Sequence, residues 1–468
     1  MKNKERIIWI SIVMALFVVL LFGVFINDAQ ASTQNSSFAY FEKFKSVYRT
    51  LKEDYVDKTM VDDKKLINGA IKGMIDSIGD KHTMYLSPED LEDLKTTSTG
   101  NFGGIGVVIT SKDDYISVDS VIEDGPAYKK GIKTGDLFIS ANGTSLKGMR
   151  LLEATKILKG DPGTTVKVEF IRKNVKMEVV IRRAIIKLPT VKSDYIEDKY
   201  GYIKISEFSG ATDNDVKKIL KQFSEKNVKA VIVDLRYNPG GLLDSVAKIV
   251  NYFQDEGVIV STIGRDGMNN DVIKASKINT IIQNDIPVVV LIDGNSASAS
   301  EIFAGAIKDL KRGILVGEKT YGKGSVQIFK QLGDDGFKLT IAKYYTPAGI
   351  CIDGIGIQPD VEVKEPEFTD DENYSLTKLY KDKQIDNFIE KNPQPKDSDI
   401  DSFVSSVQAK GYNLSTRVLK KLVRVAVERT EENRSVYDLE YDLQLKKTID
   451  LLDQGMIEYK DNKYFIKK

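Results

Sequence analysis

The stretch IPVVVLIDGNSASASEIFAGAIKDL, Ile286–Leu310, decides the fold class. It opens with a β-branched apolar run that predicts a buried strand, and it closes with apolar residues at helical spacing. Three serines on alternate positions, Ser296, Ser298 and Ser300, fill the turn between strand and helix. Such a turn offers free backbone N–H groups and the positive end of the helix dipole, so it can hold a nucleophile and the oxyanion that forms. A helix cap with small residues for close packing is the alternative.

The same alternation of strand and helix continues on the N-terminal side of this stretch. YGYIKISEFS (200–209) and KAVIVDLRYNPGG (229–241) predict strands, the second ending in a sharp turn. NDVKKILKQFSEKN (214–227) and LLDSVAKIVNYF (242–253) predict the helices that follow them. Alternation of this kind is typical of an α/β layer fold, and the Pro-Gly-Gly turn leaves further backbone amides free.

Composition limits the classes of function that remain. A length of 468 residues is enough for roughly three domains. The 68 basic and 68 acidic side chains balance, so no nucleic-acid partner is expected. Cys351 is the only cysteine, which excludes an internal disulfide and a cysteine-based metal site. His82 is the only histidine and follows a helix end, so we expect a loop histidine and no metal or other cofactor.

The N-terminus predicts contact with a membrane. Three basic residues precede Ile7–Ile26, an uncharged apolar run about long enough to cross a bilayer. The basic flank predicts that Met1 stays in the cytoplasm and that the rest of the chain lies outside the cell membrane. The alternative is a signal peptide cleaved after Ala31, because Ala29–Ala31 fits the A-x-A pattern. Both interpretations place the functional chain outside the cytoplasm.

The segments at the two ends of the chain have sequence patterns that differ from the strand-helix alternation of the α/β region. Phe38 to Leu94 has helical spacing, with a second helix expected over Lys64–Ile78. Past Glu365 the chain is polar and helical, and KNPQPKDSD (391–399) is the predicted linker. This tail carries no recognisable chemistry, so we expect it to serve in packing, in contact between two copies of the chain as a homodimer, or in substrate restraint.

Between Asn101 and Arg183 the chain has short strands and glycine turns that resemble a PDZ domain. FGGIGVVI (102–109) and GPAYKKGIKTGDLFISANG (125–143) carry the likeness, with a helix expected near Leu151–Leu158. A generic small β domain is the alternative. The resemblance implies that backbone N–H groups of one loop capture a peptide's terminal carboxylate while the peptide adds a strand to the sheet edge. The loop comprises Phe102, Gly103, Gly104, Ile105 and Gly106.

A serine nucleophile needs a base, and with one histidine the candidates are lysine, aspartate and glutamate. In GEKTYGKGSVQ (317–327), Lys323 lies between two glycines, which allow its backbone to approach another segment closely. The ordinary pKa of a lysine side chain is about 10.4, so lysine acts as a base at neutral pH only if burial disfavours its charged form. Gln327 would share a face with Lys323 in an extended segment and could accept a hydrogen bond from the amine. A solvated turn lysine and a surface glutamine are the alternatives.

Together SASASEIFAGAIKD, YGKGSVQ, DLRYNPGG and the PDZ-like region resemble the carboxyl-terminal processing peptidases, also called tail-specific proteases. The likeness runs from about Phe38 to Glu365 and resumes at VYDLEYDLQL (436–445), whereas 367–434 departs from the family's tail. It implies a spiral ββα core with a PDZ domain covering the site. It also implies roles for particular residues: Ser298 as nucleophile, Lys323 as base, Gln327 as its orienting partner, and backbone amides of Ala299, Gly240 and Gly241 as oxyanion hole. Asp309 matches an acidic position sometimes counted with the site, but on a helix it lies about three turns from Ser298, so we expect a structural role for it.

The expected protein is therefore a multidomain α/β serine endopeptidase that binds its protein substrates by their C-termini. The alternative is a membrane-tethered PDZ adaptor whose protease core is inactive. The expected segments are a transmembrane anchor or signal peptide (1–31), an N-terminal helical region (38–95), a PDZ domain (96–185), a serine-protease core (189–365) and a C-terminal helical region (366–468).

Overall fold

The computed structural model describes residues 38–91, 94, 100–112, 114–122, 124–428 and 435–467. They divide into two compact units, with the boundary between Tyr85 and Leu86. The candidate anchor Ile7–Ile26 and the candidate cleavage site after Ala31 lie outside the described residues. Within the ranges given above, no helix combines the length and the apolar character that crossing a bilayer requires.

The N-terminal unit is mainly helical. Residues 38–54 form a helix, followed by η1 (Lys58–Met60) and α2 (Asp63–Asp76). The Asp62 carboxylate caps α2 by accepting a hydrogen bond from the Lys65 N–H at 2.7 Å. The predicted second helix is thus confirmed to within two residues at each end. The region up to Leu94 is not helical throughout as expected, because Met84–Leu86 forms the strand β1, after which residues 88–91 and Leu94 are helical again.

The PDZ-like region forms one antiparallel sheet with the strand order β3-β4-β5-β7-β8, and β6 pairs with β5. The strands are β3 (Val107–Lys112), β4 (Tyr115–Val121), β5 (Leu137–Ala141), β6 (Thr144–Ser145), β7 (Thr165–Arg172) and β8 (Val175–Arg182). Two helices, α4 (Pro126–Lys129) and the predicted α5 (Leu151–Leu158), cover the core around Phe138. The pair β2 (Asn101–Gly104) and β9 (Ala184–Lys187) joins the two ends of this region.

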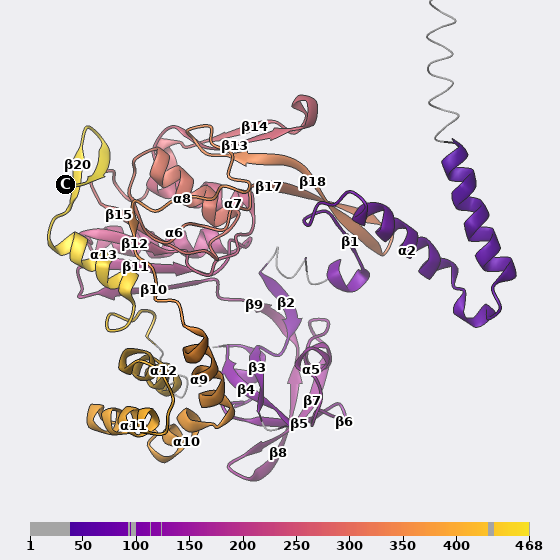
Figure 1. Cartoon of the computed structure of the whole chain (residues 1–468), viewed down its shortest axis with the longest axis horizontal. Helices are drawn as coiled ribbons and strands as arrows, with labels where there is room; N and C mark the ends of the chain where they lie inside the picture. Colours follow the sequence, from indigo (N-terminus) through magenta and orange to yellow (C-terminus); the bar gives the residue numbers. More distant parts are fainter. Residues whose placement is uncertain are drawn as a thin grey trace, which may run out of the picture. The chain divides into compact units, whose positions relative to one another are not determined.

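A six-stranded sheet of order β10-β11-β12-β15-β16-β19 forms the centre of the larger unit (Figure 1). Its strands are β10 (Val191–Ile196), β11 (Tyr200–Ile205), β12 (Ala230–Asp234), β15 (Val288–Ile292), β16 (Ile314–Gly317) and β19 (Val361–Glu362). Only β10 is antiparallel to its neighbour. The loops that follow β11, β12, β15 and β16 therefore share one edge, where α/β sheets bind their ligands.

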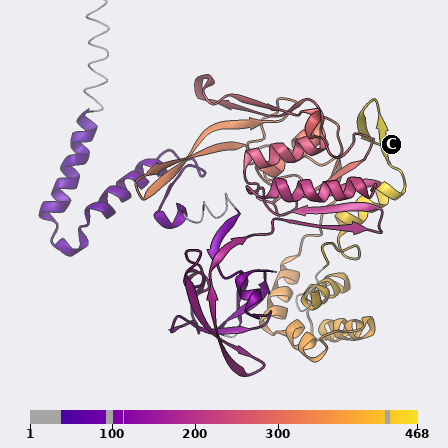
Figure 2. The same ribbon diagram turned by 180° about the vertical axis from the view of Figure 1, so that it is seen from behind.

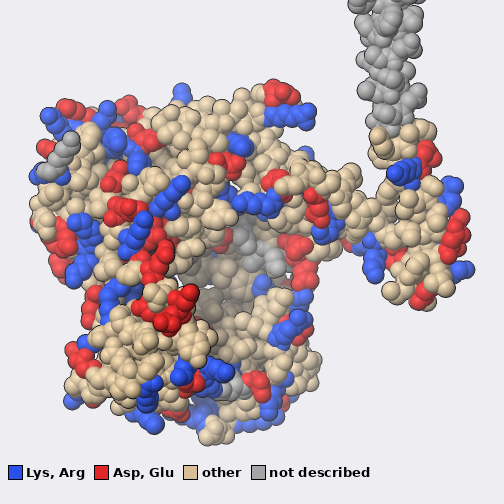
Figure 3. Space-filling model, viewed as in Figure 1, with Lys and Arg blue, Asp and Glu red and all other residues tan. Residues whose placement is uncertain are grey.

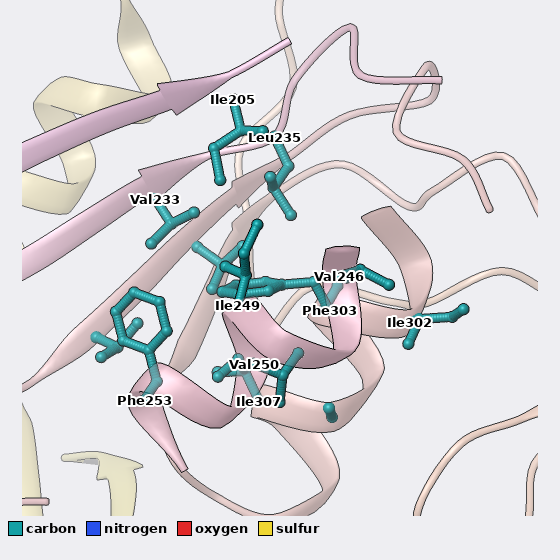
Figure 4. Close-up of a cluster of buried hydrophobic side chains, with 14 of the residues drawn as sticks. Ile205, Val233, Leu235, Val246, Ile249, Val250, Phe253, Ile302, Phe303 and Ile307 are labelled. Atoms are coloured by element: carbon teal, nitrogen blue, oxygen red, sulfur yellow. The ribbon is translucent and has the colours of Figure 1, made fainter. Parts of the chain in front are cut away.

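Helices cover both faces of this sheet because its central strands carry buried apolar side chains on both faces. In β12, Val231 and Val233 pack against α6 (Thr212–Glu225), α7 (Leu243–Phe253) and α8 (Ala299–Asp309), which Figure 2 shows side by side. Figure 4 shows α7 and α8 side chains converging on Val233 and Leu235. Ala230 and Ile232 face α13 (Leu443–Asp453) and the hairpin β20–β21 (Ile457–Lys460, Lys463–Ile466) instead. Burial on both faces fixes the register of the strands.

Antiparallel strands extend the protease region beyond the central sheet. They are β13 (Val258–Gly264), β14 (Asp271–Lys274), β17 (Ser325–Leu332) and β18 (Asp335–Tyr345), with the short helices η2 (Arg265–Gly267) and η3 (Lys277–Asn279) nearby. The segment that carries Lys323 enters this sheet, because β17 begins two residues after it and pairs with β18.

The tail has a hydrophobic core of its own. Its helices are α9 (Asp370–Lys381), α10 (Gln384–Lys391), α11 (Asp397–Ala409) and α12 (Thr416–Glu428). Phe388 stacks on Phe403 with ring centroids 4.3 Å apart, which packs α10 against α11. The predicted linker KNPQPKDSD is thus a connection between two packed helices and not a boundary between domains. On the face shown in Figure 3, basic and acidic side chains are interspersed.

Candidate active site

Ser298 has the backbone geometry of a residue held under strain. It caps α8 with φ 54° and ψ −113°, a region that side chains other than glycine rarely adopt. The side chain is half-buried, directly after the strand β15 and its turn. Strain of this kind persists only where the surroundings fix it, and it clusters at functional sites.

The two neighbouring serines are structural. Ser296 and Ser300 are fully buried. The Ser296 hydroxyl donates to the Leu235 carbonyl at 2.8 Å, and the Ser300 hydroxyl donates to the Asn238 carbonyl at 2.9 Å. Both bonds tie the serine turn to the segment that follows β12. Ser298 alone of the three is partly exposed, which fits the nucleophile assigned to it.

The Pro-Gly-Gly turn lies directly against Ser298. A Cβ on Gly240 would lie 2.8 Å from the Ser298 Cβ, and a Cβ on Gly241 would lie 2.3 Å from the Phe208 carbonyl oxygen. Both glycines also have positive φ, at 110° and 140°. Only glycine fits at either position. Of the three predicted oxyanion donors, the Gly240 N–H is already bonded within the turn, since it donates to Asn238 Oδ1 at 2.8 Å.

Glycines bring the Lys323 segment into close contact with another loop, as the sequence predicted. A Cβ on Gly324 would lie 2.2 Å from the Asp353 backbone nitrogen. Gly322 has φ 91°, and its carbonyl accepts a hydrogen bond from the Gly354 N–H at 2.8 Å. The Tyr321 N–H donates to the Ser296 carbonyl at 3.1 Å. This last bond joins the lysine segment to the serine turn.

Glu301 connects the two predicted catalytic residues, and sequence reasoning missed it. Its fully buried carboxylate accepts hydrogen bonds from the Ser298 N–H and the Lys323 N–H, both at 2.8 Å and both on Oε2. Oε1 accepts from the Gly322 N–H at 2.7 Å and from the Thr320 hydroxyl at 2.6 Å. Burial raises the pKa of the Glu301 carboxyl, while these four donors oppose the shift. The available signal was the spacing S-x-x-E of a capping box.

Gln327 lies in β17, on the segment expected. Its Nε2 donates to the Ser325 hydroxyl at 2.7 Å and to the Thr340 hydroxyl at 3.4 Å, which leaves the amide oxygen as an acceptor. A face shared with Lys323 was predicted for one continuous extended segment. The strand begins only at Ser325, and its pairing with β18 is irregular between Val326 and Gln327. Its orienting role stays a prediction.

Asp309 lies at the far end of α8 from Ser298. Eleven residues of helix span about 16 Å, so this carboxylate is remote from the nucleophile. It accepts a hydrogen bond from the Ala348 N–H at 3.0 Å and thereby holds the loop after β18. His82 lies in the N-terminal unit, where its N–H donates to Asp80 Oδ1 at 3.0 Å. In the described residues, no group of three or more His, Cys, Asp or Glu side chains could hold a metal ion.

A groove of about 250 Å³ runs between β3 and α5 of the PDZ-like region. Of the five predicted loop residues, Gly103 packs elsewhere, because a Cβ on it would lie 2.2 Å from the Gly160 carbonyl oxygen. The groove is lined by the other four together with residues of both elements: Phe102, Gly104, Ile105, Gly106, Val107, Val108, Ile109, Leu151, Thr155, Leu158 and Lys159. A strand edge beside a helix is the geometry of peptide binding by strand addition.

Comparisons with known proteins agree with this arrangement. Family models match the chain as Peptidase family S41 over residues 199–363, as a PDZ domain over 103–182, and as the activating protease CtpB N-terminal domain over 25–90. The carboxy-terminal-processing protease of Bartonella bacilliformis is 37% identical over 359 residues, covering 74% of this chain and 81% of the relative. The carboxy-terminal processing protease CtpA of Bacillus subtilis is 37% identical over 359 residues, covering 76% and 75%.

Among solved structures, the photosystem II D1 C-terminal processing protease is similar at 28% identity and a TM-score of 0.42, covering 69% of this chain and 92% of that one. A PDZ domain of the carboxy-terminal protease from Vibrio cholerae, solved with a peptide, is 30% identical over 19% of this chain and 99% of that one, with a TM-score of 0.18. On the family match and the identity to curated relatives, the chain belongs to peptidase family S41 and is a serine-type carboxyl-terminal processing protease with a PDZ domain.

Proposed function

We propose that this protease acts outside the cytoplasm, selects substrates by their C-termini through the PDZ groove, and cuts them with Ser298 and Lys323. The observation that carries the catalytic part is the shared Glu301 oxygen, 2.8 Å from the backbone nitrogens of both residues. One buried carboxylate thereby holds the nucleophile segment against the base segment. A serine without a histidine needs another base beside it, and this contact supports Lys323 in that role.

In the proposed mechanism, Ser298 Oγ attacks the scissile carbonyl carbon while the neutral Lys323 amine takes its proton. The backbone amides of Gly241 and Ala299 donate to the oxyanion of the tetrahedral intermediate. Collapse breaks the C–N bond, and Lys323 returns the proton to the leaving amine. Water then attacks the acyl-enzyme while Lys323 accepts its proton. The bond between Ser298 Oγ and the acyl carbon breaks, and Lys323 returns the proton to Oγ, which regenerates the serine and the neutral amine. Gln327 orients the amine throughout.

The experiment for the catalytic part is incubation of the full chain with an unstructured protein at neutral pH. Proteolysis that depends on Ser298 supports the proposal. An intact substrate would favour the adaptor alternative, in which the PDZ groove binds C-termini and the core is inactive.

Recognition of the C-terminus predicts that the terminal charge matters. A peptide with a free carboxylate should be cut with a higher kcat/KM than the same peptide with an amidated end. Hydrogen bonds to a charged group contribute about 1.5–3 kcal/mol, so we expect a ratio of about 10 to 100. The measurement is kcat/KM for one peptide pair that differs only at this group.

A groove variant gives the control for this pair. Thr155 is half-buried on α5 and lines the groove without belonging to the core cluster of the domain. Thr155→Trp should fill the groove and bring the acid and amide rates together. Equal rates in the unmodified protein would instead make the PDZ domain a tether or spacer.

The N-terminal segment predicts an anchored protein. Ile7–Ile26 should keep the protease with the membrane fraction through a high-salt wash, because an apolar span is held by burial and not by charge. The core should be accessible to protease added from outside the cell. N-terminal sequencing of the mature chain decides between anchor and signal: a chain that starts at Ser32 would contradict the anchor.

A further inference from the structure

The carboxylate of Asp442 joins the C-terminal segment to the residues that follow β12. Asp442 caps α13 by accepting a hydrogen bond from the Leu445 N–H at 3.0 Å. The same carboxylate binds the Arg236 guanidinium with both oxygens, Oδ1 to Nη1 at 2.7 Å and Oδ2 to Nη2 at 2.6 Å. The two residues are 206 positions apart in the chain. Bidentate pairs of this kind fix the orientation of the guanidinium as well as its position.

Arg236 is held from its other side by a buried carboxylate at the end of β12. Asp234 is fully buried and binds Arg236 through Nε at 2.9 Å and Nη2 at 2.6 Å. The Tyr202 hydroxyl also donates to Asp234 at 2.6 Å. Burial alone would raise the pKa of Asp234, but the guanidinium outweighs it and lowers this pKa. The arginine therefore lies between Asp234 and two residues of the tail, Asp442 and Gln444, whose Oε1 accepts a hydrogen bond from Nη1 at 3.4 Å. Of these two, only Asp442 is charged.

Arg236 begins the segment that ends in the Gly240–Gly241 turn beside Ser298. The Tyr237 N–H donates to Asp293 at 3.1 Å, and Tyr237 has φ 61°, which a bulky residue rarely adopts. The buried Asn238 side chain follows and bonds both the Ile205 carbonyl at 2.9 Å and the Gly240 N–H at 2.8 Å. These bonds hold the residues between Arg236 and the Gly240–Gly241 turn in one conformation.

We propose that Asp442 is a positioning residue for catalysis: by orienting Arg236 it holds the segment 236–241, and with it the oxyanion amides, against Ser298. The tail then takes part in turnover although it contributes no reacting group. This inference rests on the proposed catalytic roles of Ser298 and the glycine turn. A displaced oxyanion hole weakens binding of the transition state and not of the substrate, so kcat should fall and KM should change little.

A second acidic residue of the same helix provides a matched control. Asp453, at the other end of α13, contacts Lys199 and accepts a hydrogen bond from the Tyr200 hydroxyl at 2.8 Å. Tyr200 begins β11, so this contact lies at the edge of the sheet opposite to the catalytic turn. Both carboxylates attach α13 to the sheet, but of the two only Asp442 bonds Arg236.

The test compares Asp442→Asn and Asp453→Asn in the full chain. Asparagine still caps a helix, and Arg236 keeps Asp234 as a partner, so the Asp442→Asn variant should fold. We expect its kcat to fall about tenfold or more with KM within about twofold, since a small misplacement of catalytic groups has effects of this size. Asp453→Asn should keep kcat within about twofold, even if its Tm falls by as much as that of Asp442→Asn.

Asp442→Glu keeps the charge and should recover part of the lost kcat, which a general loss of packing would not explain. Two results would overturn the inference: an unchanged kcat in Asp442→Asn, or equal losses of kcat in Asp442→Asn and Asp453→Asn at equal Tm. If the unmodified protein does not hydrolyse the substrate, the proposed function itself is wrong. That result is distinguishable because it does not depend on any variant.

Discussion

Ser298→Ala should lower kcat by at least about 10³-fold and leave the fold intact, because removing a nucleophile ends covalent catalysis while transition-state binding contributes a residual rate. The side chain is only half-buried, and the strained backbone that carries it is held by Glu301 and the glycine turn. The substitution therefore removes the hydroxyl and no packing contact. Steady-state rates on an unstructured substrate, with the Tm measured in parallel, check both parts.

The neighbouring serines are the controls for this substitution. Ser296→Ala and Ser300→Ala each remove a buried hydrogen bond to the segment after β12, and Ser296→Ala also removes the bond that the Asp293 N–H donates at 3.0 Å. Each such bond stabilises the fold by about 1 kcal/mol. We expect both variants to melt a few degrees lower and to remain active. An inactive Ser300→Ala beside an active Ser298→Ala would show that the nucleophile was assigned to the wrong serine of the run.

Glu301→Ala should have a large effect on both activity and stability. It leaves four donors without their acceptor: the N–H groups of Ser298, Gly322 and Lys323, and the Thr320 hydroxyl. An unsatisfied buried donor costs about 1–3 kcal/mol, so the free energy of unfolding should fall by several kcal/mol. Loss of the link between the two catalytic segments should lower kcat/KM by about 100-fold, as a displacement near 1 Å does.

A nearby glutamate serves as the comparison for Glu301. Glu318 follows β16 and accepts a hydrogen bond from the Glu365 N–H at 3.1 Å. Glu318→Ala should leave kcat/KM within about twofold, since surface substitutions away from such networks have small effects. If Glu301→Ala keeps the activity of Glu318→Ala, the carboxylate is a helix cap and has no part in aligning Ser298 with Lys323.

Elements with a long, regular apolar pattern could be predicted from the sequence. The helix Leu151–Leu158 and the helices between 200 and 253 were found because their apolar residues recur at helical spacing, and the strands beside them were found because they are continuous apolar runs. Short elements were missed: β1 (Met84–Leu86) and the hairpin β20–β21 have three or four residues per strand, too few to show a period. The strands β20 and β21 pair with each other across the turn Asp461–Asn462, which the sequence analysis did not recognise.

The candidate site divides in the same way. Ser298, Lys323 and the glycine turn were found because each lies in a distinctive local motif. Glu301 was missed because S-x-x-E fits a helix cap equally well, and its bond to Lys323 joins segments 22 residues apart. The role of Asp442 could not be predicted from the sequence, because its partner Arg236 is 206 positions away in the chain. Interactions between distant segments need the fold before they can be recognised.

The central claim is that Ser298 and Lys323 act as one unit, and kcat/KM for four variants on one peptide tests it most directly. The variants are Ser298→Ala, Lys323→Ala, Lys323→Arg and the double Ser298→Ala/Lys323→Ala. Arginine keeps the positive charge but stays protonated, so it cannot serve as the base. We expect all four to lose activity to the same residual level, the double no further than either single. Losses that multiply in the double variant, or a Lys323→Arg protein that keeps most of its activity, would contradict the shared role of nucleophile and base.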